Sequence, residues 1–319
     1  MGLSQEGQLR NVETVDQQSL SRSPISVVVT NYDTADHTLR CVEGVARFKG
    51  DRRIEMVVVD DASAEPIQDR LPPWVTLVSN PTNHGYVRSV NIGVRRTSGD
   101  VVLLLDSDAA PLCDVFAPIA AAFSERPRLG ALGFHLVDRA GNPTGATATE
   151  PTALGLALGQ TLEQHLQRVA PRYFGTAFTI HSCAVAFRRS AFDRLGGFDE
   201  EFDFLDADTD FSMRLRRAGW ELDVDHRIQI LHEGGGSPQS TSRRVVRFHA
   251  NRWRLLMKHG LLDHPRVIKT ALAARHAAEL LLLEGPSRLL FRDASTRADK
   301  IRGRRQLLAR VWRSYRDAG

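Results

Sequence analysis

The sequence has few cysteines and no long apolar run. Its three cysteines are widely spaced, and no two of them form a CxxC pair: Cys41, Cys113 and Cys183. This spacing excludes a disulfide framework and a zinc knuckle, so we expect three free thiols in a reducing cytosol. No stretch reaches the ~18 consecutive apolar residues that a membrane-spanning helix needs. Residues 1–23 are polar and lack the apolar segment of a secretory signal, and we expect a disordered leader.

Positive charge is concentrated near the C-terminus. The 319 residues carry a net charge of +4, yet residues 243–319 contain 19 Lys and Arg against 6 Asp and Glu. The C-terminal part therefore carries +13 and the remainder −9. A nucleic-acid reader usually has its basic surface over the fold itself, so we expect no nucleic-acid partner. We expect a basic segment that contacts an anionic membrane surface, or that packs on the domain or on a second subunit as a homodimer.

Short valine-rich runs alternate with helical patterns in the first third of the chain. The runs that we expect to form buried strands cover residues 25–31, 54–61, 75–80 and 101–108. A helical pattern through Val45 follows the first run, and another over 86–97 precedes the last. This alternation predicts an α/β fold, a mostly parallel sheet with helices on both faces. Beyond Ser240 the pattern predicts two or three amphipathic helices.

Three of these strands end in polar residues. The strand ends are Thr30-Asn31, Asp60-Asp61 and Asp106-Ser107-Asp108. In open α/β sheets, ligands bind beyond the carboxyl ends of the strands. We therefore expect a binding site where these strand ends meet.

The segment LLLDSDAAP (103–111) places two carboxylates around one residue at the end of a buried strand. A turn there can aim Asp106 and Asp108 at the same point. Mg²⁺ and Mn²⁺ take oxygen ligands from one or two carboxylates and from the oxygens of a diphosphate. The segment thus predicts a divalent metal site, although Asp-x-Asp taken alone is also typical of a solvated turn.

Two later segments carry further candidates. In DADTDFSMRLRRAGW (206–220) a helix is expected to begin near Asp208, with Asp206 or Asp208 at its N-terminus. Such a carboxylate is either an ordinary N-cap or a general base that remains ionised beside an acceptor hydroxyl. In LHEGGGS (231–237), His232 precedes three glycines whose backbone can approach a phosphate closely. His232 is either a metal ligand or a structural histidine.

Taken together, these segments resemble the glycosyltransferase family 2 pattern with a GT-A fold, and particularly its rhamnosyltransferase-like members. The resemblance runs from Ile25 to about Gly260. The matching pieces, in order, are SVVVTNYD, VVVDDAS, NPTNHGYVRSVNIGVRRTSGDVVLLLDSD, SCAVAFRRSAFDRLGGFDEEF, DADTDFSMRLRRAGW, LHEGGGS and NRWRLLMKHG. The resemblance implies a GT-A catalytic domain over residues 24–240 and a helical C-terminal extension over 241–319.

The resemblance also implies a binding site for a nucleotide sugar. Thr30 and Asn31 would lie against the nucleoside, Asp60 would accept the N–H of a uracil or thymine ring, and Ser182 would stand beside the donor sugar. The full set of implied nucleotide-sugar-binding residues is Thr30, Asn31, Asp60, Asn83, Gly85, Arg88, Asn91, Asp106, Ser107 and Ser182.

The resemblance assigns the metal ligands and the base in the same way. Asp108 would bind Mg²⁺ or Mn²⁺ directly, with Asp106 and His232 as the other metal residues. Asp208 aligns with the aspartate of the family's Glu-Asp pair, the base that deprotonates the acceptor. The family glutamate is Ala207 here, a departure that leaves Asp206 as a rival for the base.

The implied reaction is an inverting transfer of a sugar from a UDP-, dTDP- or GDP-sugar to a hydroxyl acceptor, which would be a glycan, a lipid-linked molecule or a small molecule. We expect a cytoplasmic enzyme of bacterial polysaccharide or glycoconjugate biosynthesis, peripheral at the inner face of the cell membrane if the basic segment binds lipid. Two alternatives are a nucleotidyltransferase and a non-catalytic nucleotide-sugar-binding homologue. The first would normally show a basic Gly-rich loop after the first strand, and TNYDTADHT contains no glycine.

Overall fold

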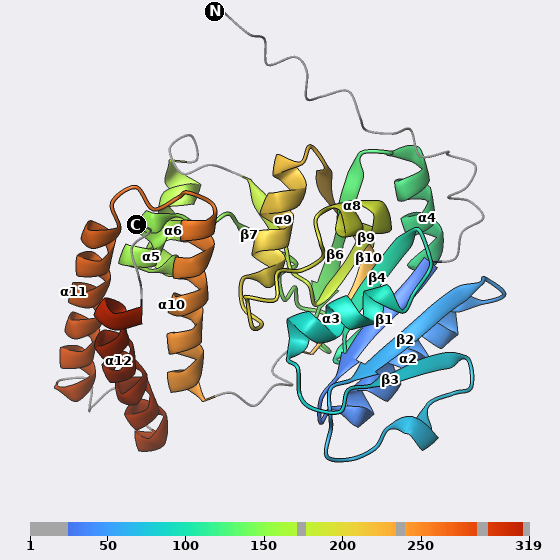
Figure 1. Cartoon of the computed structure of the whole chain (residues 1–319), viewed down its shortest axis with the longest axis horizontal. Coiled ribbons are helices and arrows are strands. Elements are labelled where there is room, and N and C mark those ends of the chain that lie inside the picture. The colour runs from blue at the N-terminus through green and yellow to red at the C-terminus, as the bar shows by residue number, and fades with distance from the viewer. Residues whose placement is uncertain (1–24, 171–176, 234–239, 286–292, 315–319) are drawn as a thin grey trace, which may run out of the picture.

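The computed structural model describes residues 25–170, 177–233, 240–285 and 293–314. Within them the chain forms a lobe built on a large sheet and a helical lobe beside it (Figure 1). The predicted leader over residues 1–23 lies outside the described residues. Among the helices that the structure describes, none is long and apolar enough to cross a bilayer.

An eight-stranded sheet forms the larger lobe, in the order β3-β2-β1-β4-β9-β6-β10-β5. In chain order its strands are β1 (Ile25–Asn31), β2 (Ile54–Asp60), β3 (Val75–Ser79), β4 (Val101–Asp106), β5 (Ala109–Pro111), β6 (Leu129–Val137), β9 (Ala184–Arg188) and β10 (Glu221–His232). Strands β3, β2, β1 and β4 run parallel, whereas β9 is antiparallel to both of its neighbours. The prediction of a mostly parallel sheet is confirmed for the first half of the lobe.

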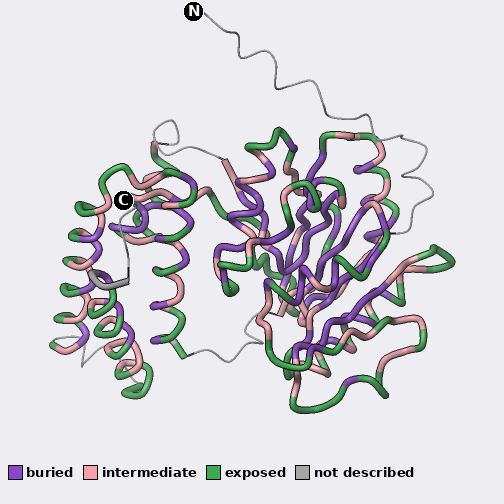
Figure 2. The backbone as a smooth tube through the Cα atoms, in the orientation of Figure 1, coloured by how far each residue is buried: buried purple, intermediate pink, exposed green. Residues whose placement is uncertain are grey.

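Helices bury both faces of the first strands. Helix α2 (Ala35–Lys49) covers one face, where Val27 of β1 packs in the same cluster as Val42. Helix α3 (Tyr86–Arg95) covers the other face, where Val28 packs with Val90. The strands of the sheet accordingly appear as the main buried region in Figure 2. Burial on both faces explains why these strands read as continuous apolar runs in the sequence.

The first four strands end within two residues of the expected positions, whereas helix α2 extends to Lys49 and not only to Val45. Strand β4 ends at Asp106 because the chain turns there and leads into β5, which pairs with β10 at the edge of the sheet. The remaining elements of this lobe are η2 (Gln68–Arg70), α4 (Phe116–Glu125), α8 (Arg189–Arg194), α9 (Ala207–Arg217) and the two-stranded sheet of β7 (Thr147–Thr149) and β8 (Phe178–Ile180).

The helical lobe is built from two separate parts of the chain. Its members are α5 (Ala153–Leu158), α6 (Gln160–Val169), α10 (Thr241–Lys258), α11 (Pro265–Glu284) and α12 (Ala294–Ser314). Leu156 of α5 joins the apolar cluster that Trp253, Leu272 and Leu307 form between the last three helices. The C-terminal segment therefore packs against residues of its own chain, which is the packing alternative of the sequence prediction. Contact with a membrane or a second subunit remains a prediction.

The three cysteines are free, and they differ in accessibility. Cys41 and Cys183 are buried, whereas Cys113 is partly exposed beside β10. Burial raises the pKa of both the Cys41 and the Cys183 thiol, and nearby carboxylates, Asp106 first among them, raise these pKa values further. A thiol with a raised pKa contains little thiolate, the form that reacts with disulfide reagents.

We expect titration with a disulfide reagent to separate the three thiols. In the native protein only Cys113 should react quickly, and all three should react after denaturation without reductant. Cys113→Ser should abolish the fast phase and leave two thiols in the denatured protein. A denatured wild-type value near one thiol would contradict the prediction, because it would mean that two cysteines are paired.

Candidate functional site

The polar strand ends meet at one edge of the sheet, as the sequence predicts. The register of β1 pairs Thr30 with Asp106 of β4 on one side and Asn31 with Asp60 of β2 on the other. Beyond Asp106 the chain turns through Ser107, whose hydroxyl accepts a hydrogen bond from Thr34 at 3.0 Å. Three neighbouring strands therefore deliver their polar residues to the same place.

Asp106, Asp108 and His232 form a cluster with the composition of a metal site. Each offers one ligand atom within 4.8 Å of the other two, and His232 Nε2 lies 3.6 Å from Asp108 Oδ1. The antiparallel pairing of β10 with β5 brings His232 there, since it lies opposite Ala109 in the register. Residues more than a hundred positions apart in the sequence thus meet at one point.

The Asp106 carboxyl group fits a cation. Its Oδ1 is buried and has no hydrogen-bond partner. Burial raises the pKa of Asp106 to about 7, and the charge of Asp108 contributes to the rise. Two close carboxylates repel each other more strongly when they are removed from water. A divalent cation between them would relieve this repulsion, so the residues present fit the metal that the family pattern implies.

Asn31 holds Asp60 in place. Its side-chain nitrogen donates to Asp60 Oδ1 at 2.6 Å and to Ser63 Oγ at 3.0 Å. Its side-chain oxygen accepts from Thr34 at 3.1 Å and from Thr38 at 2.8 Å. The amide of Asn31, 1% exposed, is therefore fully used within the protein. This arrangement orients Asp60 at the strand end where a nucleobase contact is predicted.

Asp61, which the sequence indicates only as part of a polar strand end, shapes the loop before α3. Its carboxylate accepts hydrogen bonds at 2.8 Å from the backbone of His84 and Gly85 and from the side chain of Asn80. Gly85 has φ 84°, a left-handed conformation that favours glycine, and its N–H also donates to Asn83. The second aspartate of VVVDDAS was the signal that could have revealed this role.

Arg88 and Asn91 bind a loop of their own protein. Asn91 donates to the carbonyl of Phe198 at 2.8 Å and accepts the N–H of the same residue at 3.0 Å. Arg88 pairs with Glu200 at 2.9 Å. These contacts support a structural role in fixing the GGFDE segment on α3. A nucleotide contact through either side chain remains a prediction.

Asp208 lies in the first turn of α9 and faces the segment before β9. Its Oδ2 accepts the N–H of Ser182 at 3.1 Å, and its Oδ1 accepts the N–H of Thr209 at 2.7 Å. Burial raises the pKa of Asp208, although His181 and the Ser182 N–H oppose the rise. Loss of hydration thus outweighs these two contacts in the direction of the shift, and the expectation that Asp208 remains ionised stays a prediction.

Asp206 takes the N-cap position of α9 but does not cap the helix. Its two carboxylate oxygens accept from Arg252 of α10 at 3.0 Å and 2.8 Å. Ala207, at the position of the family glutamate, is buried in the apolar cluster below α3. Trp220 is buried, and the three glycines after Glu233 lie outside the described residues.

Asp210 is fully buried and paired with three basic side chains. Its oxygens lie 2.7 Å from Arg214, 2.7 Å from Lys258 and 2.9 Å from His259. Burial alone would raise the pKa of Asp210, but these partners outweigh it and lower the pKa to about 2. Because all three partners are basic and Asp210 is enclosed, this carboxylate is structural and joins α9 to α10.

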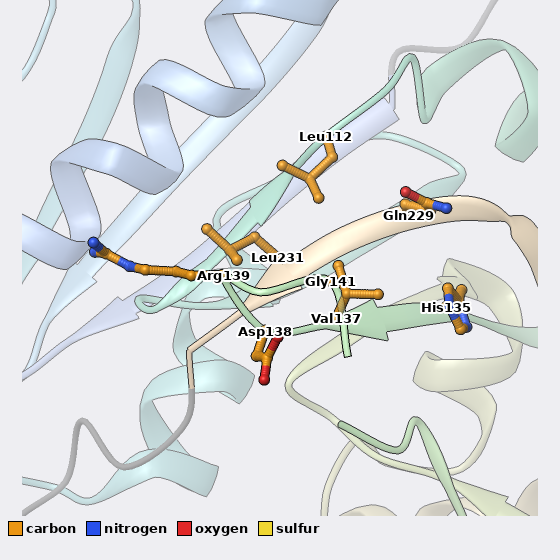
Figure 3. A pocket seen from close by; sticks show the side chains of 8 residues that line it. All are labelled: Leu112, His135, Val137, Asp138, Arg139, Gly141, Gln229 and Leu231. Atoms are coloured by element: carbon orange, nitrogen blue, oxygen red, sulfur yellow. The ribbon is translucent and has the colours of Figure 1, made fainter. Parts of the chain in front are cut away.

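A cavity of about 360 Å³ lies on the β6–β10 side of the sheet (Figure 3). It is lined by Leu112, His135, Val137, Asp138, Arg139, Gly141, Gln229 and Leu231. Leu231 and His232 are neighbours in a strand, so their side chains point to opposite faces of the sheet. The cavity is therefore on the other side of β10 from the metal cluster.

Comparison with known proteins identifies the family of this chain and its fold. The sequence model of glycosyl transferase family 2 matches residues 26–196. An N-acetylglucosaminyl-diphospho-decaprenol L-rhamnosyltransferase of Mycobacterium tuberculosis is 23% identical over 303 residues, covering 82% of this chain and 98% of the relative. The O-antigen biosynthesis protein RfbC of Myxococcus xanthus is 24% identical over 234 residues; the match covers 69% of this chain and only 18% of that protein.

Solved structures show the same fold. The mannosyltransferase PcManGT from Pyrobaculum calidifontis, in complex with GDP-Man and Mn²⁺, superimposes with a TM-score of 0.54 and 17% identity, covering 90% of this chain and 87% of that one. GalNAc-T7 with UDP, GalNAc and Mn²⁺ gives a TM-score of 0.55 at 18% identity, covering 73% and 48%. The protein is thus a glycosyltransferase with the GT-A fold. The chain belongs to glycosyl transferase family 2, and the nucleotidyltransferase and non-catalytic alternatives are not supported.

We expect Asp210→Asn to lower the free energy of unfolding by about 3 kcal/mol at pH 7, because it leaves buried basic groups unpaired. The folded pKa of Asp210 lies below the unfolded one, so its contribution is present above pH ~4 and lost as the pH falls toward 2. Urea unfolding should therefore show the wild type and the variant converging as the pH falls below 4.

Asp36→Asn is the matched control, because Asp36 pairs with Arg70 at the surface. It should change the free energy of unfolding far less than Asp210→Asn does, because water screens an exposed ion pair. An Asp210→Asn variant as stable as this control would contradict the structural assignment.

Proposed function

We propose that this glycosyltransferase moves a sugar from a nucleoside diphosphate sugar to a hydroxyl acceptor by an inverting, metal-assisted displacement. The observation that carries the proposal is the Asp106–Asp108–His232 cluster at the carboxyl edge of the sheet, with Asp208 close enough that its charge raises the pKa of Asp106. A metal-ligand set and a separate carboxylate are the two functions that such a displacement needs.

Asp108 and His232 would hold the cation, with Asp106 completing the set or reaching the donor's ribose. When bound, Mg²⁺ or Mn²⁺ supplies positive charge that stabilises the nucleoside diphosphate as a leaving group. Two solved relatives of the same fold are named as Mn²⁺ complexes, which supports a divalent cation without distinguishing manganese from magnesium.

The donor would lie across the ends of β1, β2 and β4. Asp60, oriented by Asn31, would accept from the nucleobase, and the loop that Asp61 holds would border the nucleotide. Relatives of this fold are named with GDP-Man or UDP, and the decaprenol in the name of the mycobacterial relative favours a lipid-linked acceptor. The sugar and the acceptor of this chain are best sought among such compounds.

Asp208 would deprotonate the acceptor hydroxyl while that oxygen attacks the anomeric carbon from the side opposite the leaving diphosphate. The bond from the anomeric carbon to the phosphate oxygen breaks as the new glycosidic bond forms, so the configuration inverts in one displacement. Asp206 is less suitable as the base, because both of its oxygens are bound to Arg252. One carboxylate suffices for this chemistry, unlike the pair in a glycosidase.

We expect Asp108→Ala to remove metal-dependent binding of UDP, because it deletes the ligand nearest His232. Calorimetry with Mn²⁺ and UDP measures this directly. Asp69→Ala changes an exposed aspartate that is not part of the cluster, and this variant should bind like the wild type. Unchanged affinity in Asp108→Ala would refute the metal assignment.

We expect Asp208→Asn to bind donor and metal normally but to lower kcat by ~100- to 10,000-fold, as loss of a general base does. In the wild type, kcat should fall as the pH drops through the pKa of Asp208, and this fall should occur above the range of an exposed aspartate because burial raises that pKa. The measurement is nucleotide release against pH with a panel of UDP-, GDP- and dTDP-sugars. Asp225→Asn, which removes the partner of the exposed Arg227, is the control. An Asp208→Asn variant with wild-type kcat would exclude this base.

A further inference from the structure

Helix α10 supports the loop that leads into α9. Arg247 and Asn251 each bind the carboxylate of Asp203 at 2.6 Å. Asn251 also donates to the carbonyl of Leu205 at 3.0 Å. Leu256, on the same helix, is completely buried in the helical lobe. The loop before the proposed base therefore rests on a rigid element that lies outside the sheet.

The pair of Arg252 and Asp206 is the most enclosed contact in this support. Nε of Arg252 donates to Oδ2 at 3.0 Å and Nη2 donates to Oδ1 at 2.8 Å. The two side chains are only 12% and 5% exposed, and the guanidinium lies 4.9 Å from the centre of the Phe248 ring. A bidentate hydrogen bond of this kind fixes the orientation of both groups, whereas an ion pair through a single hydrogen bond does not.

The backbone of Asp206 begins α9. Its φ is 66°, in the left-handed region that non-glycine residues seldom occupy. Its carbonyl accepts the N–H of Asp210 at 2.8 Å, which closes the first turn of the helix. Its side chain contributes no capping hydrogen bond, because Arg252 occupies both oxygens. The ion pair therefore holds the residue whose unusual conformation starts the helix.

Asp206 and Asp208 point in different directions. Asp206 faces α10, whereas Asp208 faces the N–H of Ser182 on the other side. A shift of Asp206 would turn the first helical turn and move the Asp208 carboxylate relative to that N–H.

We propose that Arg252 is a positioning residue for the reaction. By binding both carboxylate oxygens of Asp206 from α10, it fixes the first turn of α9 and thereby orients Asp208 toward the acceptor. The inference rests on the proposed role of Asp208 as the base. The helical lobe then contributes to the chemistry without touching substrate, and the catalytic unit includes α10 as well as the sheet.

The test compares Arg252→Gln and Arg252→Lys with the matched control Arg254→Gln. Arg254 lies on the same helix as Arg252, and its ion pair with Glu201 is exposed. Nucleotide release is measured with Mn²⁺ and the fastest donor from a panel of UDP-, GDP- and dTDP-sugars. Arg252→Gln should lower kcat by ~10- to 100-fold, since a small displacement of a catalytic group has effects of this size. The KM for the donor and the affinity for UDP with Mn²⁺ should stay within about twofold of wild type.

Arg252→Lys should recover part of the lost kcat because it restores the charge, and Arg254→Gln should behave as wild type. Hydrogen exchange of the peptide covering residues 207–212 should accelerate in Arg252→Gln and remain unchanged in Arg254→Gln. A double variant with Asp206→Asn should lose no more activity than Arg252→Gln alone, because both changes remove one interaction.

Wild-type kcat in Arg252→Gln would overturn the inference. So would a joint loss of kcat and UDP affinity that lysine does not repair, since that is the signature of a damaged fold. If the wild type binds UDP and Mn²⁺ but releases nucleotide from no donor, the proposed function fails. Unchanged hydrogen exchange in Arg252→Gln would refute the positioning role independently of turnover.

Discussion

A buried carboxylate connects the two lobes of this glycosyltransferase. Asp210 is inaccessible to solvent and has Arg214 from its own helix and Lys258 and His259 from the end of α10 as partners. Burying such a charge is costly unless it is paired. These ion pairs therefore attach α10 to α9 in the folded protein. The contacts of Arg252 and Asn251 with the preceding loop depend on that attachment.

The positions of the basic side chains separate the aspartates of this region into two groups. Asp206 and Asp210 have arginine or lysine within hydrogen-bond distance. Asp106 and Asp208 have no such partner among the described residues, and burial raises the pKa of both. A carboxylate left without a cation in a buried place is free to bind a metal or a proton. The same residue type is thus either used in structure or left available for the proposed chemistry, according to what faces it.

The sequence was sufficient to predict the first half of the sheet and the edge where the site lies. The runs ending at Asn31, Asp60 and Asp106 are apolar because both faces of their strands are buried, and that signal is local. It was not sufficient for contacts between distant segments. Nothing near Asn91 indicates that it binds Phe198, and nothing near Asp206 indicates Arg252. The excess of positive charge in the last 77 residues left open a membrane surface or packing on the protein, and it did not indicate that several of these arginines pair with the acidic loop before α9.

The helical lobe takes α5 and α6 from the middle of the chain and α10 to α12 from its end. Leu156 packs among residues that follow it by about a hundred positions or more. A C-terminal exchange between related enzymes would therefore not transfer this lobe as a unit, because part of its apolar core would remain in the recipient. Recombination that alters it must replace two separated stretches together. Gradual substitution along both stretches is the easier route by which this lobe could diverge within the family.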